Sequence, residues 1–250
     1  MPMLEGLGAA QIAIIAGIVF GAFVIRGMSG FGAGMIGIPL LAFLMPVHTA
    51  VPMFGLLVLT LFVFLSIRDW GTVVKEELKR LVLPTLLGVA GGVLLFKHLD
   101  NRLLLNLLGG FLLAYSTYAL AVSYFGLPQY SCSHRWAFPV AFAGAFIDTL
   151  FGGGGGTLVV IYLHMRGVGR GPFRATVAAL WLFEMIARIL GYGAAGYYNA
   201  DILLLCALLL PVMGAGTWVG ERLGNRITHE AFSRLMALLL LLAGASLLVK

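Results

Sequence analysis

The chain has 250 residues, of which 61% are hydrophobic and 10% are charged, whereas soluble domains carry about 25% charged residues. Several apolar runs approach the length of about 20 residues that crosses a bilayer as a helix, which excludes a soluble globular fold. The net charge of +6 indicates basic loops on the cytoplasmic side of a membrane rather than nucleic-acid binding.

The first half of the chain, residues 1–125, is predicted to contain one interrupted segment and three membrane spans. An apolar segment over residues 9–25 leads into a glycine-rich stretch, residues 27–34, and a short apolar helix over residues 35–45 follows. The short helix has about half the length needed to cross a bilayer. The spans cover residues 49–67, 81–96 and 103–125, and the polar run 75–80 is expected to form a loop or interfacial turn.

A linker over residues 126–135 separates this half from the second, residues 136–250, which repeats the same pattern. Residues 136–151 lead into five consecutive glycines, and a short helix over residues 158–165 follows them. Three further spans are predicted over residues 175–190, 202–219 and 231–249. The match between the halves, segment by segment, indicates an internal duplication.

Both glycine stretches, break one (residues 27–34) and break two (residues 152–156), are predicted to interrupt a helix at bilayer depth. Five glycines in succession exceed the one small residue per turn that close helix packing needs. The unpaired N–H groups that open the following half-helix favour an anion in a wet cavity. The residues expected to bind this anion are Ser29, Gly30, Phe31, Gly32, Gly34, Gly152, Gly153, Gly154, Gly155, Gly156 and Thr157. Pairs of glycines four residues apart fit helix packing instead, and these are Gly17/Gly21, Gly88/Gly92 and Gly216/Gly220.

The distribution of basic residues predicts how the two halves are related. If each break turns the chain back, most Lys and Arg residues lie on one side of the membrane, whereas they divide nearly evenly if it does not. Basic residues accumulate in cytoplasmic loops. We therefore expect an all-α polytopic membrane protein made of two inverted-topology repeats. Each repeat is a glycine-broken helical hairpin plus three transmembrane helices, and both termini lie outside.

Four charged residues fall within or at the ends of predicted spans, where each costs about 2.5–3.5 kcal/mol unless it is paired or hydrated. Glu184 and Arg188 lie four residues apart on one helix face. Either they neutralise each other, or Arg188 binds an anion while Glu184 orients it or carries a proton. Arg26 and Asp148 occupy matching positions before the two breaks and are interpreted as a structural pair across a pseudo-twofold axis.

Three further residues, His48, Thr49 and Thr176, lie beside the ends of the half-helices. The two threonines begin corresponding spans, where they either cap a helix or face the cavity. Neither the histidines nor the two cysteines, Cys132 and Cys206, form a ligand pattern, so no metal site and no cofactor is expected. The sequence has no P-loop and no convincing nucleophile–base set, so no enzymatic activity is expected.

The two halves resemble the TauE/SafE sulfite exporter family over nearly the whole chain. The resemblance is carried by residues 29–34 with Ile38-Pro39-Leu40-Leu41, by residues 152–156, and by the motifs around Gly88/Gly92 and Gly216/Gly220. In the second half Ile161 stands where the family usually has proline, and Asp148 precedes the break. The resemblance implies secondary transport, often outward, of small sulfur-containing or carboxylate anions such as sulfite or sulfoacetate.

These observations together predict a secondary transporter that works by alternating access around an anion site between the two glycine-broken helices. A proton gradient or the gradient of the anion itself would drive it. The alternative is a passive anion channel lined by the same breaks. The expected partners are a small anion and the lipid bilayer, without nucleic acid, and a homodimer is compatible with this interpretation. The expected location is the cell membrane, as a multi-pass protein of a bacterial inner or plasma membrane.

Overall fold

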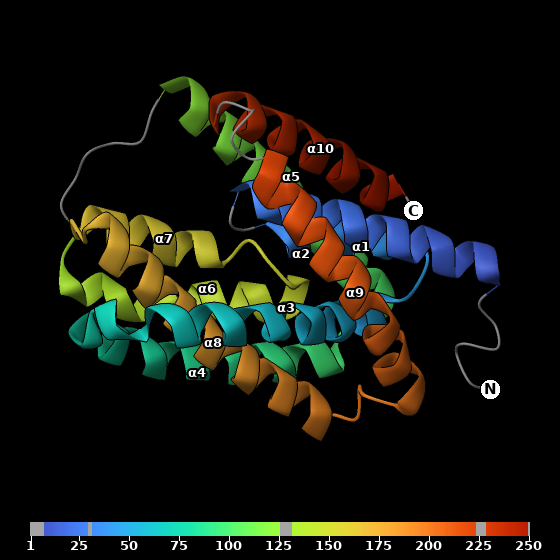
Figure 1. The fold of residues 1–250 in the computed structure, drawn as a ribbon, viewed down its shortest axis with the longest axis horizontal. Helices are drawn as coiled ribbons and strands as arrows, with labels where there is room; N and C mark the ends of the chain where they lie inside the picture. The colour runs from blue at the N-terminus through green and yellow to red at the C-terminus, as the bar shows by residue number, and fades with distance from the viewer. Residues whose placement is uncertain (1–7, 30–31, 126–131, 224–228, 250) are drawn as a thin grey trace. The chain divides into compact units, whose positions relative to one another are not determined.

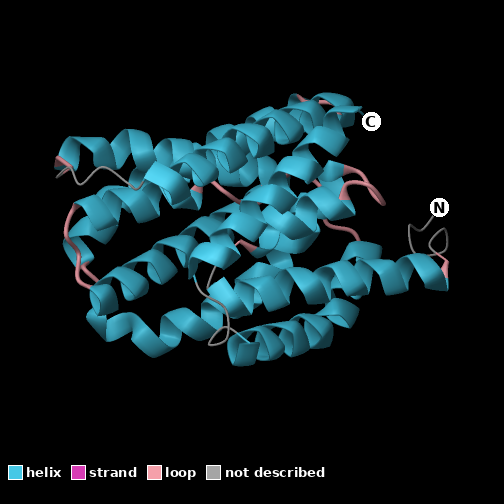
Figure 2. Ribbon diagram, turned by 90° about the horizontal axis from the view of Figure 1, so that it is seen from above, coloured by secondary structure: helices cyan, strands magenta, loops and turns pink. Residues whose placement is uncertain are grey.

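The computed structural model describes residues 8–29, 32–125, 132–223 and 229–249. Every regular element in these ranges is helical (Figure 2). Five of the helices are long and apolar enough to cross a membrane by length and composition. This confirms the predicted all-α, polytopic membrane fold, and the inverted relation of the halves stays a prediction.

The order of helices follows the predicted pattern in both halves. The first half contains α1 (Ala9–Ser29), α2 (Ala33–Leu41), α3 (Val47–Asp69), the short 3-10 helix η1 (Trp70–Thr72), α4 (Lys75–His98) and α5 (Asn101–Phe125). The second half contains the 3-10 helix η2 (His134–Trp136), α6 (Ala137–Phe151), α7 (Gly156–Met165), α8 (Arg170–Ala194), α9 (Ala200–Leu223) and α10 (His229–Val249). In each half, a long helix and a short one flank a glycine break.

One predicted boundary is wrong, because the polar run 75–80 is not a loop but the first part of α4. Glu76 and Glu77 lie in the first turn of that helix, where acidic side chains interact favourably with the helix dipole. Glu77 is also buried against partners that are distant in sequence. The polar residues of this run predicted a loop, whereas contacts with residues distant in sequence allow these charged side chains to lie in a helix.

The helices assemble into two compact units, and each unit draws on both halves of the sequence. Unit 1 comprises Met1–Phe54, Leu99–Leu127 and Tyr198–Lys250, and therefore α1, α2, the start of α3, α5, α9 and α10. Unit 2 comprises Gly55–His98 and Pro128–Tyr197, and therefore the rest of α3 with α4, α6, α7 and α8. The two packing units therefore do not coincide with the two sequence repeats, residues 1–125 and 136–250. The repeats themselves stay a prediction.

In unit 1, α1 packs against α9 and α5 packs against α10 (Figure 1). Glycines allow both approaches. A Cβ atom at Gly216 would lie 2.6 Å from the carbonyl oxygen of Phe20, and one at Gly244 would lie 2.9 Å from the carbonyl oxygen of Gly109. The packing role predicted for Gly216/Gly220 is therefore confirmed. A Cβ atom at Gly17 or Gly21 has no described neighbour within 4 Å, so the prediction for that pair is wrong.

In unit 2, α4 packs against α6 and α8, again through glycine. A Cβ atom at Gly88 would collide with the carbonyl oxygen of Phe142, and one at Gly92 would lie 2.7 Å from Cβ of Thr149. These contacts confirm the packing role predicted for Gly88/Gly92. In the contact between α4 and α8, a Cβ atom at Gly191 would lie 2.8 Å from Val93 Cγ2. Close contact through small residues therefore holds α6, which carries the buried Asp148, and α8, which carries the buried Glu184 and Arg188, against α4.

Candidate functional site

Break one lies in unit 1, and the helices reach into its predicted range of residues 27–34, because α1 ends at Ser29 and α2 begins at Ala33. Gly32 precedes α2 with φ +91°, a left-handed conformation that favours glycine, and Gly34 is buried within the helix. Ser29 is the last residue of α1. Gly30 and Phe31 lie outside the described residues, as does the side chain of Ser29, so the structure describes only part of this expected anion site.

Break two lies in unit 2, between the end of α6 and the start of α7. Gly152 and Gly154 have φ values of +76° and +98°, so the chain leaves α6 through left-handed residues. Gly155 and Gly156 are required for a second reason, since a Cβ atom at Gly155 would collide with the carbonyl oxygen of Gly144 and one at Gly156 would lie 2.8 Å from Trp181 Nε1. Gly153 and Thr157, the remaining candidates, are half-buried beside them.

The start of α7 already carries a negative group, the carboxylate of Asp148. Its Oδ1 accepts a hydrogen bond of 2.8 Å from the N–H of Gly155, and the N–H of Gly156 also interacts with this carboxylate. A helix N-terminus stabilises a negative charge placed there. In this conformation, therefore, two of the N–H groups expected to bind substrate at break two are bonded to the protein's own acid.

Glu184 and Arg188 meet on α8, as their spacing predicts. Arg188 Nη1 lies 3.6 Å from Glu184 Oε1, and the two residues are only 1% and 3% exposed. Arg188 also interacts electrostatically with Asp148 and with Tyr192, and the hydroxyl of Tyr192 donates a hydrogen bond to the carbonyl oxygen of Thr149. Helices α6 and α8 thus bring Asp148, Glu184, Arg188 and Tyr192 into one buried cluster.

Sequence reasoning missed Tyr192. The signal was present, because Tyr192 follows Arg188 by four residues and therefore lies on the same helix face. A tyrosine near the end of an apolar span is, however, also typical of a membrane interface. Only the packing of α8 against its neighbours shows that this side chain is fully buried.

Three buried side-chain atoms in the described part of the chain have no hydrogen-bond partner, and all three belong to unit 2. They are Thr85 Oγ1 on α4, and Glu184 Oε1 and Arg188 Nε on α8. A buried polar atom without a partner costs about 1–3 kcal/mol, and more when the group is charged. Two of the three atoms, Glu184 Oε1 and Arg188 Nε, belong to the same buried charged cluster on α6 and α8.

Other predicted site residues lie elsewhere. Arg26 is buried on α1 in unit 1, where Glu221 on α9 is its electrostatic partner, so its expected pairing with Asp148 of unit 2 stays a prediction. His48 and Thr49 are half-buried in the first turn of α3. Thr176 lies inside α8 and is therefore not a helix cap. Its hydroxyl donates a hydrogen bond to the carbonyl oxygen of Pro172 (2.7 Å) and accepts one from the N–H of Val74 (2.9 Å).

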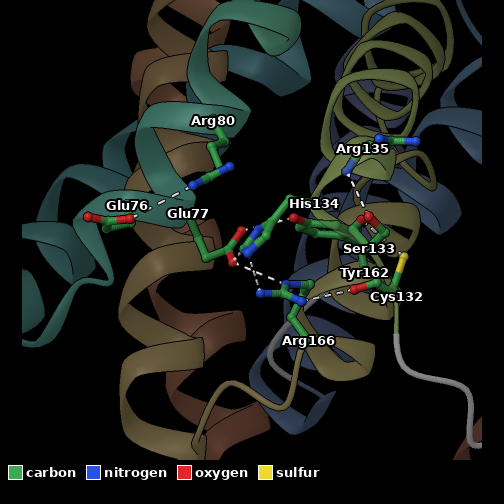
Figure 3. A network of polar contacts seen from close by, with 9 residues as sticks. All are labelled: Glu76, Glu77, Arg80, Cys132, Ser133, His134, Arg135, Tyr162 and Arg166. Atoms are coloured by element: carbon green, nitrogen blue, oxygen red, sulfur yellow. Dashed lines mark hydrogen bonds and ion pairs between the residues drawn. The ribbon is translucent and has the colours of Figure 1, made fainter.

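A second polar cluster, which we call the Glu77 cluster, was not predicted (Figure 3). The carboxylate of Glu77 on α4 accepts hydrogen bonds from the hydroxyl of Tyr162 (2.9 Å) and from Nε of Arg166 (3.2 Å). His134 Nδ1 lies 3.4 Å from the same carboxylate. Arg166 also donates to the carbonyl oxygen of Cys132 (2.9 Å) and contacts Nε2 of His134 (2.7 Å). The cluster ties the C-terminal end of α7 to α4 and to the residues that precede α6.

No group of histidine, cysteine and acidic residues that could hold a metal ion occurs among the described residues. The side chains of Asp148, Glu184, Arg188 and Tyr192 can form ion pairs and hydrogen bonds, and the two acids can bind protons. A buried guanidinium is suited to an oxyanion, because its donors form a rigid fork that matches two oxygen atoms.

Comparison with known proteins identifies the family of the chain. Residues 13–247 match the family described as Sulfite exporter TauE/SafE, which is nearly the whole chain. No curated protein and no solved structure gives a significant match. The family consists of membrane transporters for sulfur-containing anions rather than enzymes, and the long apolar helices fit a protein embedded in a membrane. The resemblance seen in the two breaks is confirmed: the chain belongs to the TauE/SafE sulfite exporter family.

Proposed function

We propose that this protein is a secondary transporter that carries small sulfur-containing or carboxylate anions, such as sulfite or sulfoacetate, outward across the cell membrane. The observation that carries the proposal is the buried guanidinium of Arg188. Its nearest carboxylate oxygen lies at 3.6 Å, and its Nε has no partner among the described residues. An oxyanion bound here would accept two parallel hydrogen bonds from the guanidinium.

In this proposal the anion interacts with different groups at the two breaks. At break two, Asp148 is bonded to the N–H of Gly155, so the anion is expected at Arg188 rather than on the first N–H groups of α7. Break one has a basic residue, Arg26, at the matching place, so the N–H groups that open α2 remain candidates for anion binding. Alternating access would expose these elements to the two sides of the membrane in turn.

Exchange in proteoliposomes tests the transport class. Vesicles preloaded with unlabelled sulfoacetate should take up labelled sulfoacetate faster than empty vesicles, because a carrier returns more quickly when it is loaded. A panel of sulfite, sulfoacetate and simple carboxylates would rank the substrates. Uptake without such stimulation would indicate a passive channel instead, and uptake of none of these anions would reject the proposed function.

Variants of Arg188 test its role. Arg188→Lys keeps the charge but loses the fork, so the apparent affinity should fall about tenfold or more, since one hydrogen bond to a charged group is worth about 1.5–3 kcal/mol. Arg188→Ala should abolish transport. The matched control is Arg80→Lys on α4, whose side chain is 47% exposed in a surface ion pair.

The double variant Glu184→Leu/Arg188→Leu distinguishes binding from mere charge neutralisation. A buried ion pair can often be replaced by apolar residues without loss of stability, whereas removing one partner is costly. If the two charges only neutralise each other, the double variant should recover the transport that each single variant loses. Full recovery would overturn the role of Arg188 as anion ligand. Normal protein levels without transport would support that role.

A further inference from the structure

The charges of the buried cluster in unit 2 do not balance. Asp148 and Glu184 are two acids, 5% and 3% exposed, whereas Arg188 is a single base, 1% exposed. The groups that act on Glu184 are Asp148 from α6 and Arg188 from α8, and Tyr192 adds a neutral hydroxyl. Among the described residues, no basic group from α4 or α7 joins this set. With both acids ionised, the cluster would hold one uncompensated negative charge, which is costly in a buried place.

The two acids differ in how their negative charge is stabilised. Asp148 accepts the N–H of Gly155 at 2.8 Å and lies at the positive end of α7, and both features favour its ionised form. For Glu184, by contrast, Oε1 has no hydrogen bond, and the guanidinium of Arg188 lies 3.6 Å from it. The cluster can therefore lose its excess charge most easily at Glu184.

We propose that Glu184 binds a proton when an anion binds to Arg188, so that the proton and the anion cross the membrane together. This inference rests on the proposed function. An anion arriving at Arg188 meets the negative charges of both acids. Protonation of Glu184 removes one of them and releases the guanidinium from its partner. Each ligand thus raises the affinity for the other, as thermodynamic linkage requires.

The coupling of proton and anion determines which gradient drives export. A proton that travels with the anion leaves the cell when the anion leaves. Because the proton gradient of an energised membrane points inward, it opposes this movement, and the outward gradient of the anion drives export. The proposed transporter would therefore acidify the outside as it exports, and an acidic outside would slow net export.

Sulfoacetate is a suitable probe because its own charge is constant between about pH 6 and pH 8. Its dissociation constant should be measured for the purified, detergent-solubilised full chain across this range. The expected result for the unchanged protein is a loss of affinity of up to about tenfold per pH unit, the limit for one linked proton. Glu184→Gln, which mimics the protonated acid, should bind with an affinity independent of pH. In proteoliposomes it should exchange anions without moving protons.

Two further variants locate the proton. Glu76→Gln, whose side chain is 86% exposed on α4, is the matched control and should keep the pH dependence. Asp148→Asn should keep it as well. If Asp148→Asn removes the pH dependence and Glu184→Gln does not, the assignment to Glu184 is overturned.

The wild-type measurements separate the two proposals. Binding with an affinity that does not change with pH would reject proton coupling and leave the transport function standing. Absence of sulfoacetate and sulfite binding at every pH, in the unchanged protein and in Glu184→Gln, would reject the transport function itself. Movement of about one proton per anion in proteoliposomes would support the coupling, even if Glu184→Gln did not fold.

Discussion

The two glycine breaks have similar backbone conformations, but the residues that precede them carry opposite charges. Each separates a long helix from a short one, and each uses glycine with positive φ, at Gly32 in unit 1 and at Gly152 and Gly154 in unit 2. The residue at the matching position before the break is Arg26 in the first half and Asp148 in the second. At break two the acid is bonded to the start of the following helix.

The two breaks are thus similar in backbone conformation and different in the charge that precedes them. The N-terminus of α7 is supplied with a negative charge by its own chain, and it needs no external anion to stabilise it. No acid stands at the matching place before α2, where the chain has an arginine. We therefore expect break one to attract anions through its N–H groups, and break two to act through Arg188.

The far ends of the two short helices differ as well. The C-terminal end of α7 is held by the Glu77 cluster, through Tyr162 and Arg166. When the proline of α4, Pro84, is aligned with that of α9, Pro211, the residue matching Glu77 is Leu204, which is 53% exposed. The Glu77 cluster therefore has no counterpart there, and α7 is anchored by polar contacts at both of its ends.

The largest expected effect comes from filling the breaks. Gly154→Leu and Gly32→Leu should each abolish transport, because a side chain is strained at φ +98° and +91° by about 1–2 kcal/mol and fills space beside the anion path. Exchange in proteoliposomes would be compared with the amount of folded protein in the membrane. Gly214→Leu on α9, where a Cβ atom has open space, is the control. Normal anion exchange by both break variants would show that these glycines serve only helix packing.

An intermediate effect, with opposite signs, is expected from the charges before the breaks. Asp148→Asn removes a negative charge from the surroundings of Arg188, so the affinity for sulfoacetate should rise. Arg26→Gln removes a positive charge before break one, so the affinity should fall. Each change should be about fivefold, which corresponds to about 1 kcal/mol. Binding measured with Asp100→Asn, an exposed acid, serves as control. Shifts of the same sign in both variants would contradict the proposal that break one attracts anions through its N–H groups and break two acts through Arg188.

The smallest effect on transport is expected from the Glu77 cluster, because its variants change the stability of the fold rather than anion binding. Arg166→Ala leaves the buried carboxylate of Glu77 with fewer donors and should destabilise the fold by about 1–3 kcal/mol. Thermal unfolding in detergent would detect this. Arg80→Ala removes a surface ion pair of 3.9 Å to Glu76 and should cost about 0–1 kcal/mol. Equal losses in the two variants would show that the cluster does not anchor α7.

The sequence by itself determined the membrane class, the order of helices and the two breaks. These depend on local properties, namely the length of apolar runs and the conformational freedom of glycine at positions such as Gly32 and Gly154. It also brought Glu184 and Arg188 together, because a spacing of four residues places side chains on one helix face.

Only the tertiary structure decided which distant groups share a site. The bond from Gly155 to Asp148 depends on how the chain turns through break two, and the contact of Glu77 with Tyr162 joins residues that are 85 positions apart. The grouping of α4 with α6 and of α9 with α1 also mixes the two sequence halves. Such contacts follow from helix packing across the chain, which hydropathy and spacing within single segments do not encode.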